Sequence, residues 1–288
     1  MPVLTILLLS LREASRRKLL IAIAILTAVA VILSAWGFQH LLQIPCGSPG
    51  RRHPCSPLDN KIEAATLLVL LMFMFSFILA LGAAFLAAPA IAGEVESGVA
   101  LSMLARPIRR GDLVLGKWLG LVVLIFVYAA LAAGLEFVVE RLLIGYTATN
   151  SLFVILFLVA EAMITLTLSL ALSTRLPAMT SGIIALVLFG MVWMGGVTGG
   201  VGAALHNRTI QDVGTVSSLV LPTDGLWRGA VYNLEPAALI SIGQSSGEAR
   251  ANPFFVSQPP ATAYLFWAAI WVTGVLSIGV WSFNRREL

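Results

Sequence analysis

The chain has 288 residues, of which 59% are hydrophobic and 11% are charged, and its formal net charge is +4. Soluble domains carry about 25% charged residues, so this composition excludes a soluble globular protein and is typical of an integral membrane protein. The positive charge is expected from lysines and arginines at one membrane surface, and it gives no indication of a nucleic-acid partner.

Six stretches approach the roughly 20 apolar residues that a helix needs to cross a bilayer. We therefore predict an all-α, polytopic membrane protein with six transmembrane helices, forming a single domain over residues 1–288. The six predicted spans are 19–38, 64–88, 113–139, 152–172, 178–200 and 264–281.

Four basic residues, Arg12, Arg16, Arg17 and Lys18, precede the first span, and no small-residue cleavage site follows it closely. We predict an uncleaved anchor with a cytoplasmic N-terminus. Six spans then return the C-terminus to the same side. The segments expected inside hold 11 of the 18 lysines and arginines, which agrees with the excess of positive charge on cytoplasmic loops.

Two cysteines lie in the first outer loop, residues 39–63. Cys46 and Cys55 bracket a turn-rich stretch, and a disulfide between them would be stable only in an oxidising compartment. A metal site that adds His40 and His53 is the alternative. We predict the disulfide and no metal site, because the prolines and glycines between the cysteines suit a tight covalent loop.

A short amphipathic helix is predicted in the cytoplasmic loop 89–112. Two acids are expected at its N-terminus, where the helix dipole favours them. Leucines follow at helical spacing, and a proline ends the helix before a basic pair. This helix could be a connector among anionic headgroups or a docking surface for another protein. Its residues are Glu94, Glu96, Gly98, Leu101, Leu104, Pro107, Arg109 and Arg110.

The next stretch is close to a phosphate-binding loop, with Gly111, Gly116 and Lys117 at the required spacing. Such a loop needs a Ser or Thr after the lysine and a buried strand before it. Trp118 stands after the lysine, and membrane helices flank the stretch. We therefore expect no nucleotide site and no catalytic residues in this chain.

Acidic residues occur in two predicted spans. Glu136 and Glu140 lie one turn apart at the outer end of the third span, either as an acidic lip for a cationic cargo or as a solvated helix end. Glu161 lies near the middle of the fourth span, with Thr165 one turn further on. A charge at that depth is costly unless it is paired or faces a cavity. Glu161 is therefore a candidate for a transport pathway, or a protonated acid bonded to a neighbouring helix.

The fifth span ends in pairs of glycines four residues apart, Gly195 with Gly199 and Gly196 with Gly200. This spacing lets membrane helices approach closely, so we expect helix packing, with a hinge or a dimer seam as alternatives.

A long outer segment, residues 201–262, follows the fifth span and exceeds the length of an ordinary connector. We predict a short helix near residues 225–234, either re-entrant or at the interface where Trp and Tyr are favoured. The segment could be a lid over the outer helix ends, a gate, or a docking place for an extracytoplasmic partner.

The cytoplasmic loop resembles the signature of the type 2 permeases of ATP-binding cassette (ABC) exporters. The basic N-terminus, residues 1–18, is similar to the amphipathic elbow helix of that family, "LPTDGLWR" at 221–228 is similar to one of its outer segments, and "FNRREL" resembles its C-terminal ending. Within the family, the pattern also resembles that of the permease of the copper-site assembly system for nitrous oxide reductase. The signature residues are Gly93, Glu94, Glu96, Gly98, Leu101, Leu104, Pro107, Arg110, Leu115, Gly116 and Lys117.

The resemblance implies a permease subunit of an exporter in the plasma (inner) membrane. Residues 94–104 would form a coupling helix that contacts a separate ABC ATPase subunit, present in two copies, which carries the ATP and magnesium. The permease itself would need no cofactor, and a second, identical chain would complete the transporter.

Two other classes of function are weighed against this interpretation. An intramembrane enzyme needs converging ligands or bases within the bilayer, whereas His40, His53 and His206 fall at or beyond the outer boundary and Glu161 stands alone at mid-depth. A membrane subunit that transmits force from an ATPase to an extracytoplasmic partner, without translocating a small molecule, is the alternative that remains.

Overall fold

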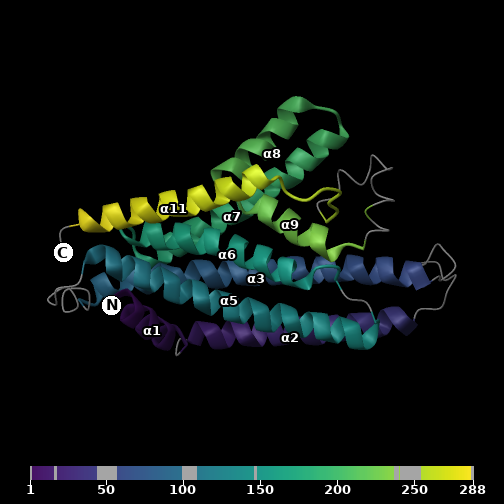
Figure 1. Ribbon diagram of the computed structural model, residues 1–288, viewed down its shortest axis with the longest axis horizontal. Helices are drawn as coiled ribbons and strands as arrows, with labels where there is room; N and C mark the ends of the chain where they lie inside the picture. The colour runs from purple at the N-terminus through teal and green to yellow at the C-terminus, as the bar shows by residue number, and fades with distance from the viewer. Residues whose placement is uncertain are drawn as a thin grey trace.

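The computed structural model describes residues 2–15, 18–43, 57–98, 109–145, 148–236, 240 and 254–286. All regular structure in these ranges is α-helical (Figure 1). The helices are α1 (Pro2–Ser15), α2 (Lys18–Gln43), α3 (Pro57–Glu96), α5 (Arg110–Leu143), α6 (Ser151–Ser173), α7 (Ala178–Ala204), α8 (Arg208–Val220), α9 (Asp224–Leu234) and α11 (Thr262–Asn284).

Six helices of the described chain are long and apolar enough to cross a membrane, namely α2, α3, α5, α6, α7 and α11. This confirms the predicted all-α class and the six spans. A helix also lies within the range predicted for the elbow, although its position at a membrane surface stays a prediction.

The predicted end of the second span was wrong. α3 continues through Pro89 to Glu96, so the loop expected to begin at residue 89 starts inside a helix. Proline removes one backbone hydrogen bond from a helix, but the residues that follow are buried, with Ile91 only 1% exposed. Their continued packing outweighs the lost bond.

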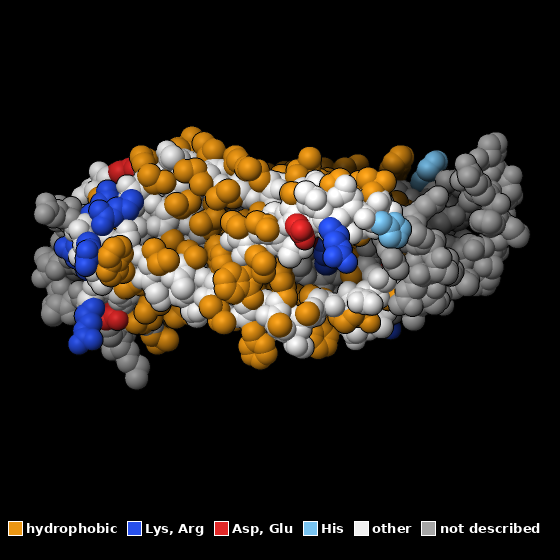
Figure 2. Space-filling model, turned by 90° about the horizontal axis from the view of Figure 1, so that it is seen from above, with side chains coloured by type: hydrophobic (Ala, Val, Ile, Leu, Met, Phe, Trp, Pro, Cys, Tyr) orange, Lys and Arg blue, Asp and Glu red, His pale blue; other side chains and the backbone are white. Residues whose placement is uncertain are grey.

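The helices form an elongated bundle around α3. α3 is the most buried of the six long apolar helices: 61% of its most apolar stretch is buried, compared with 22% in α2 and 17% in α11. It packs against α2, α5, α6 and α7. Both termini lie at one end of the bundle, which we call the terminal end, and the opposite end is the distal end (Figure 1). A broad hydrophobic surface covers the length between the ends (Figure 2).

The α7–α8 hairpin and α9 build part of the distal half. His206 has a φ of 54° in the turn between α7 and α8, and the side chain of the next residue, Asn207, accepts a hydrogen bond from the Ile210 N–H at 3.4 Å. The backbone conformation of His206 reverses the chain. Asn207 caps the start of α8, and Asn is a favoured N-cap residue. α8 therefore turns back along α7.

Three aromatic side chains of α11 satisfy the last carbonyls of α8. The Tyr264 hydroxyl donates to Ser218 O at 3.3 Å, and the indole N–H groups of Trp267 and Trp271 donate to Leu219 O at 3.0 Å and Val220 O at 2.8 Å. Helix ends leave carbonyls without intrahelical partners, and an unpaired carbonyl in an apolar layer is costly. These three hydrogen bonds from α11 allow α8 to end beside α11, which is long and apolar enough to cross a membrane.

Glycines form the contact between α7 and α8. A Cβ atom added to Gly199 would lie 2.9 Å from the Cα atom of Gly214, and one added to Gly195 would overlap the Ser217 side chain. This close approach supports the packing interpretation of the glycine pairs, within a single chain. The other two glycines have different neighbours: Gly196 meets Asp224, and Gly200 lines a cavity.

Candidate functional site

The acids of the predicted coupling helix lie at the end of α3. Glu94 and Glu96 occupy its last turn, so the prediction that they begin a separate helix was wrong. Gly98 ends the helix with a φ of 74° and donates its N–H to Val95 O at 3.2 Å, as glycine commonly does after a helix C-terminus. Residues 99–108, with Leu101, Leu104 and Pro107, lie outside the described residues, and their helix stays a prediction.

A buried lysine joins three helices beside this segment. Lys117 of α5 is 3% exposed, its Nζ atom donates to Oε1 of Glu94 in α3, and it lies 3.8 Å from Oε2 of Glu13 in α1. Buried charges are tolerated when they are paired and hydrogen-bonded. Lys117 therefore ties α1 and the end of α3 to α5, and we call these three residues the lysine node.

The glycines around Lys117 also serve contacts between helices. A Cβ atom on Gly116 would lie 2.7 Å from the Cβ atom of Ile6, and one on Gly120 would lie 2.9 Å from the Cβ atom of Ser10. Both clashes are with α1, so the missing side chains allow α1 to lie against α5. Gly116 and Lys117 of this phosphate-loop-like stretch thus have structural roles.

The basic residues after the coupling segment have different surroundings. Arg109 is exposed, whereas Arg110 donates from Nη1 to Arg286 O at 2.6 Å. Arg175 donates from Nη2 to Ser282 O at 3.1 Å. Cations are favoured at the C-terminal end of a helix. Arg110 and Arg175 therefore hold the end of α11 against α5 and against the end of α6.

The mid-span acid Glu161 lies between α6 and α3. It is 4% exposed, and Oε2 accepts a hydrogen bond from the Ser76 hydroxyl at 2.8 Å. Thr165 donates to the backbone O of Glu161, at 3.4 Å, rather than to its carboxyl group. The contact with Ser76 is the kind expected for an acid bonded to a neighbouring helix; a role for Glu161 and Thr165 in transport stays a prediction.

Glu136 and Glu140 were expected to be exposed, either as an acidic lip or as a solvated helix end. That prediction was wrong, because both side chains are buried. Glu136 is 4% exposed and Glu140 is 0% exposed. The cause is packing between α2 and α5, where the Ser34 hydroxyl donates to Glu136 Oε2 at 2.7 Å. Among the described residues, neither carboxyl oxygen of Glu140 has a hydrogen-bond partner.

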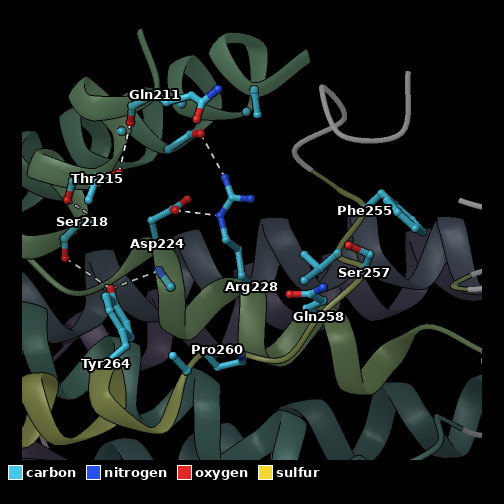
Figure 3. A pocket seen from close by; sticks show the side chains of 18 residues that line it. Gln211, Thr215, Ser218, Asp224, Arg228, Phe255, Ser257, Gln258, Pro260 and Tyr264 are labelled. Carbon is cyan, nitrogen blue, oxygen red and sulfur yellow. Dashed lines mark hydrogen bonds and ion pairs between the residues drawn. The ribbon is translucent and has the colours of Figure 1, made fainter. Parts of the chain in front are cut away.

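The distal half contains a cavity of about 830 Å³ between the α7–α8 hairpin, α9, the segment 255–261 and the start of α11. Figure 3 shows the polar side chains that line it. Most of its lining belongs to the long outer segment, residues 201–262, from which a lid or gate was predicted. Its residues come from separate parts of the chain, so no local motif could have indicated it.

An ion pair forms one wall of the cavity. Arg228 donates from Nε to Asp224 Oδ2 at 2.8 Å and from Nη2 to Gly196 O at 2.9 Å. A Cβ atom on Gly196 would overlap the Asp224 carboxyl group. Burial raises the pKa of Asp224, and the charge of Arg228 opposes that rise. The spacing of four residues in "TDGLWR" was a signal for this pair, because such residues lie on one face of a helix.

A second buried acid follows α9. Glu235 is 2% exposed, and its Oε2 atom accepts a hydrogen bond from the Val256 N–H at 3.3 Å. Burial raises the pKa of Glu235 to about 8, and the bond from Val256 opposes the rise. No prediction from the sequence singled out this residue.

The predicted disulfide between Cys46 and Cys55 lies outside the described residues and stays a prediction. His53 lies outside them too, whereas His40 stacks on Trp36 with ring centroids 5.5 Å apart. Within the described ranges, no group of three or more His, Cys, Asp or Glu residues could hold a metal ion.

Comparison with known families identifies the chain. The family model described as "ABC-2 family transporter protein" matches residues 4–288, which is nearly the whole sequence. The comparison with curated proteins gives no match, and the narrower resemblance to the nitrous oxide reductase assembly permease stays a prediction. The family consists of membrane subunits without a nucleotide-binding domain that associate with an ATPase subunit. The chain belongs to the ABC-2 transporter family and is a multi-pass permease subunit of an ABC transporter.

Proposed function

We propose that this permease is a membrane subunit of an exporter in the plasma (inner) membrane. Two copies of a separate ATPase subunit, which bind ATP and magnesium, drive it through the segment between α3 and α5. A second, identical permease chain completes the transporter. The family match supports the transport function, and the lysine node is the observation that carries the coupling proposal.

The lysine node supports coupling because of where it lies. It joins α1, the end of α3 and α5, and α3 is the most buried of the candidate spans. A partner that pushes on the segment after Glu96 would move the end of α3. The node carries that movement into α1 and α5, and the bond between Ser76 and Glu161 carries it from α3 into α6.

Charge supports an orientation with both termini in the cytoplasm. Lysine and arginine side chains gather at the terminal end (Figure 2). Cytoplasmic loops carry an excess of these residues. In this orientation the segment between α3 and α5 faces the ATPase, and the distal cavity lies on the outer side. The cavity favours transport over transmission of force alone to an extracytoplasmic partner.

The experiment compares two charge reversals at opposite ends of the molecule. Glu96 and Asp212 are both exposed, the first at the end of α3 and the second on α8. The wild-type chain, Glu96→Lys and Asp212→Lys are purified from the native host in mild detergent. Mass spectrometry identifies the bound ATPase, and ATP hydrolysis is measured for each complex.

We expect the wild-type chain and Asp212→Lys to recover the ATPase, and Glu96→Lys to recover less of it. The reason is that the first two leave the proposed contact surface unchanged. Full recovery by Glu96→Lys would place the contact elsewhere, and no ATPase with the wild-type chain would contradict the proposed partner.

A further inference from the structure

The distal cavity has the size of a small-molecule site. Its volume of about 830 Å³ falls within the roughly 300–1,000 Å³ of ligand pockets in proteins. Tyr264 and Phe255 lie on opposite sides of it (Figure 3). The cavity is therefore large enough for a ligand with one or two rings, with an aromatic side chain at each side.

The charges of the cavity disfavour an ionic ligand. Asp224 and Arg228 are the charged residues among those lining it, and they are paired at 2.8 Å. Each of the two charges already has its counterion in the other. An anion or a cation that entered the cavity would therefore lose its hydration without gaining an unpaired counterion. A neutral ligand avoids this penalty.

The hydroxyl groups of α8 present acceptors to the cavity. Thr215 donates its own hydrogen to Gln211 O at 3.2 Å, and Ser218 donates to Thr215 O at 2.9 Å. Each hydroxyl group has one hydrogen and two lone pairs. What they offer a ligand is therefore lone pairs, so the ligand must donate hydrogens on this side.

Other side chains present donors. Arg228 uses Nε and Nη2 for Asp224 and Gly196, and its third nitrogen points away from them, on the side of Phe255 and Ser257 (Figure 3). Gln211 uses one amide hydrogen for Gly202 O and has a second. A suitable ligand must therefore donate and accept within a short distance, which is what neighbouring hydroxyl groups do.

We propose that the distal cavity binds a neutral, hydroxyl-rich group, namely a sugar unit, carried by a free saccharide or by the headgroup of a glycolipid. Lone pairs on the α8 hydroxyl groups accept hydrogen bonds from the ligand hydroxyl groups, and the nitrogens of Arg228 and Gln211 donate hydrogen bonds to the same ligand groups. The two aromatic rings at the sides of the cavity lie against the apolar faces of the sugar. This binding goes beyond the permease function and needs no ATPase.

Two threonines provide a matched pair for the test. Thr215 lines the cavity and donates to the carbonyl four residues earlier at 3.2 Å. Thr198 makes the same kind of bond at 2.8 Å on the exposed side of α7 and does not line the cavity. The full chain is reconstituted in phosphatidylcholine nanodiscs. Saturation-transfer NMR measures binding of maltose and of glucose 6-phosphate, and native mass spectrometry measures retention of a glucosyl diacylglycerol.

We expect the wild-type chain to bind maltose or the glucosyl lipid in preference to glucose 6-phosphate, and the arm that responds identifies the source of the sugar. Thr215→Val should weaken that binding about fivefold, the loss of roughly one neutral hydrogen bond, and Thr198→Val should leave it unchanged. The proposal is overturned if neither sugar binds, if the phosphate binds best, or if both variants weaken binding equally. Failure of the ATPase contact would not change this result, since the ATPase is absent.

Discussion

Lys117 is a buried cation on which the stability of the terminal end depends. Its replacement by Met keeps the length of the side chain but leaves Glu94, which is 8% exposed, without this cation. Removing one partner of a buried ion pair costs about 3 kcal/mol or more. We expect Lys117→Met to lower the melting temperature in detergent clearly. The double variant with Glu94→Gln should recover part of the loss, because the buried carboxylate is gone.

The contrary result is equally measurable. If Lys117→Met melts at the wild-type temperature, or if the double variant is less stable than Lys117→Met, the ion pair does not hold the three helices together.

Glu235 predicts a dependence of stability on pH. Its pKa rises from an ordinary value of 4.5 to about 8 in the folded chain. Between these values the folded state holds a proton that the unfolded state has lost, so stability falls as pH rises. The slope for one such proton approaches about 1.4 kcal/mol per pH unit. We expect Glu235→Gln to remove this slope and to melt higher than the wild-type chain near pH 8. Identical melting curves across the window would show that Glu235 is not buried as described.

The α7–α8 hairpin tests packing at the scale of an element. Gly199 and Gly190 lie in the same helix, but a Cβ atom on Gly199 would lie 2.9 Å from the Cα atom of Gly214, while one on Gly190 would meet nothing within 4 Å. Gly199→Ala should cost about 1–3 kcal/mol through overpacking. Gly190→Ala should be neutral or stabilising by up to about 1 kcal/mol, because alanine favours helix. Thermal melting of the two variants gives the comparison, and equal melting temperatures would contradict the close glycine packing of α7 against α8.

At the scale of an element, the sequence predicted which helices exist better than it predicted where they end. All six spans were predicted, because about 20 consecutive apolar residues have few other uses. The end of α3 was not, because Pro89 and two nearby acids are typical of a helix boundary, whereas burial of Ile91 continues the helix. The same signal assigned Glu94 to a separate helix. Its burial against Lys117 could not be predicted locally, because Lys117 lies 23 positions away in sequence.

At the scale of the whole molecule, the sequence predicted the family but not the distal cavity. The cytoplasmic motif is continuous, so it could be recognised without coordinates. The exposure of Glu136 and Glu140 depends on which face of α5 packs against α2, and apolar residues all round a span do not indicate that face. The cavity combines α7, α8, α9 and α11, so only the three-dimensional arrangement brings its residues together.

The central claim is that ATP binding at the terminal end changes the distal half of the permease. Hydrogen exchange of the complex, measured by mass spectrometry with and without ATP and vanadate, tests it without any substitution. We expect the amides of α8 to exchange at a different rate when nucleotide is trapped, because the proposed movement of α3 would reach α6 and α7, which pack against α3, and α8, which packs against α7. Unchanged exchange throughout α8 and α9, in a complex that hydrolyses ATP, would contradict the account.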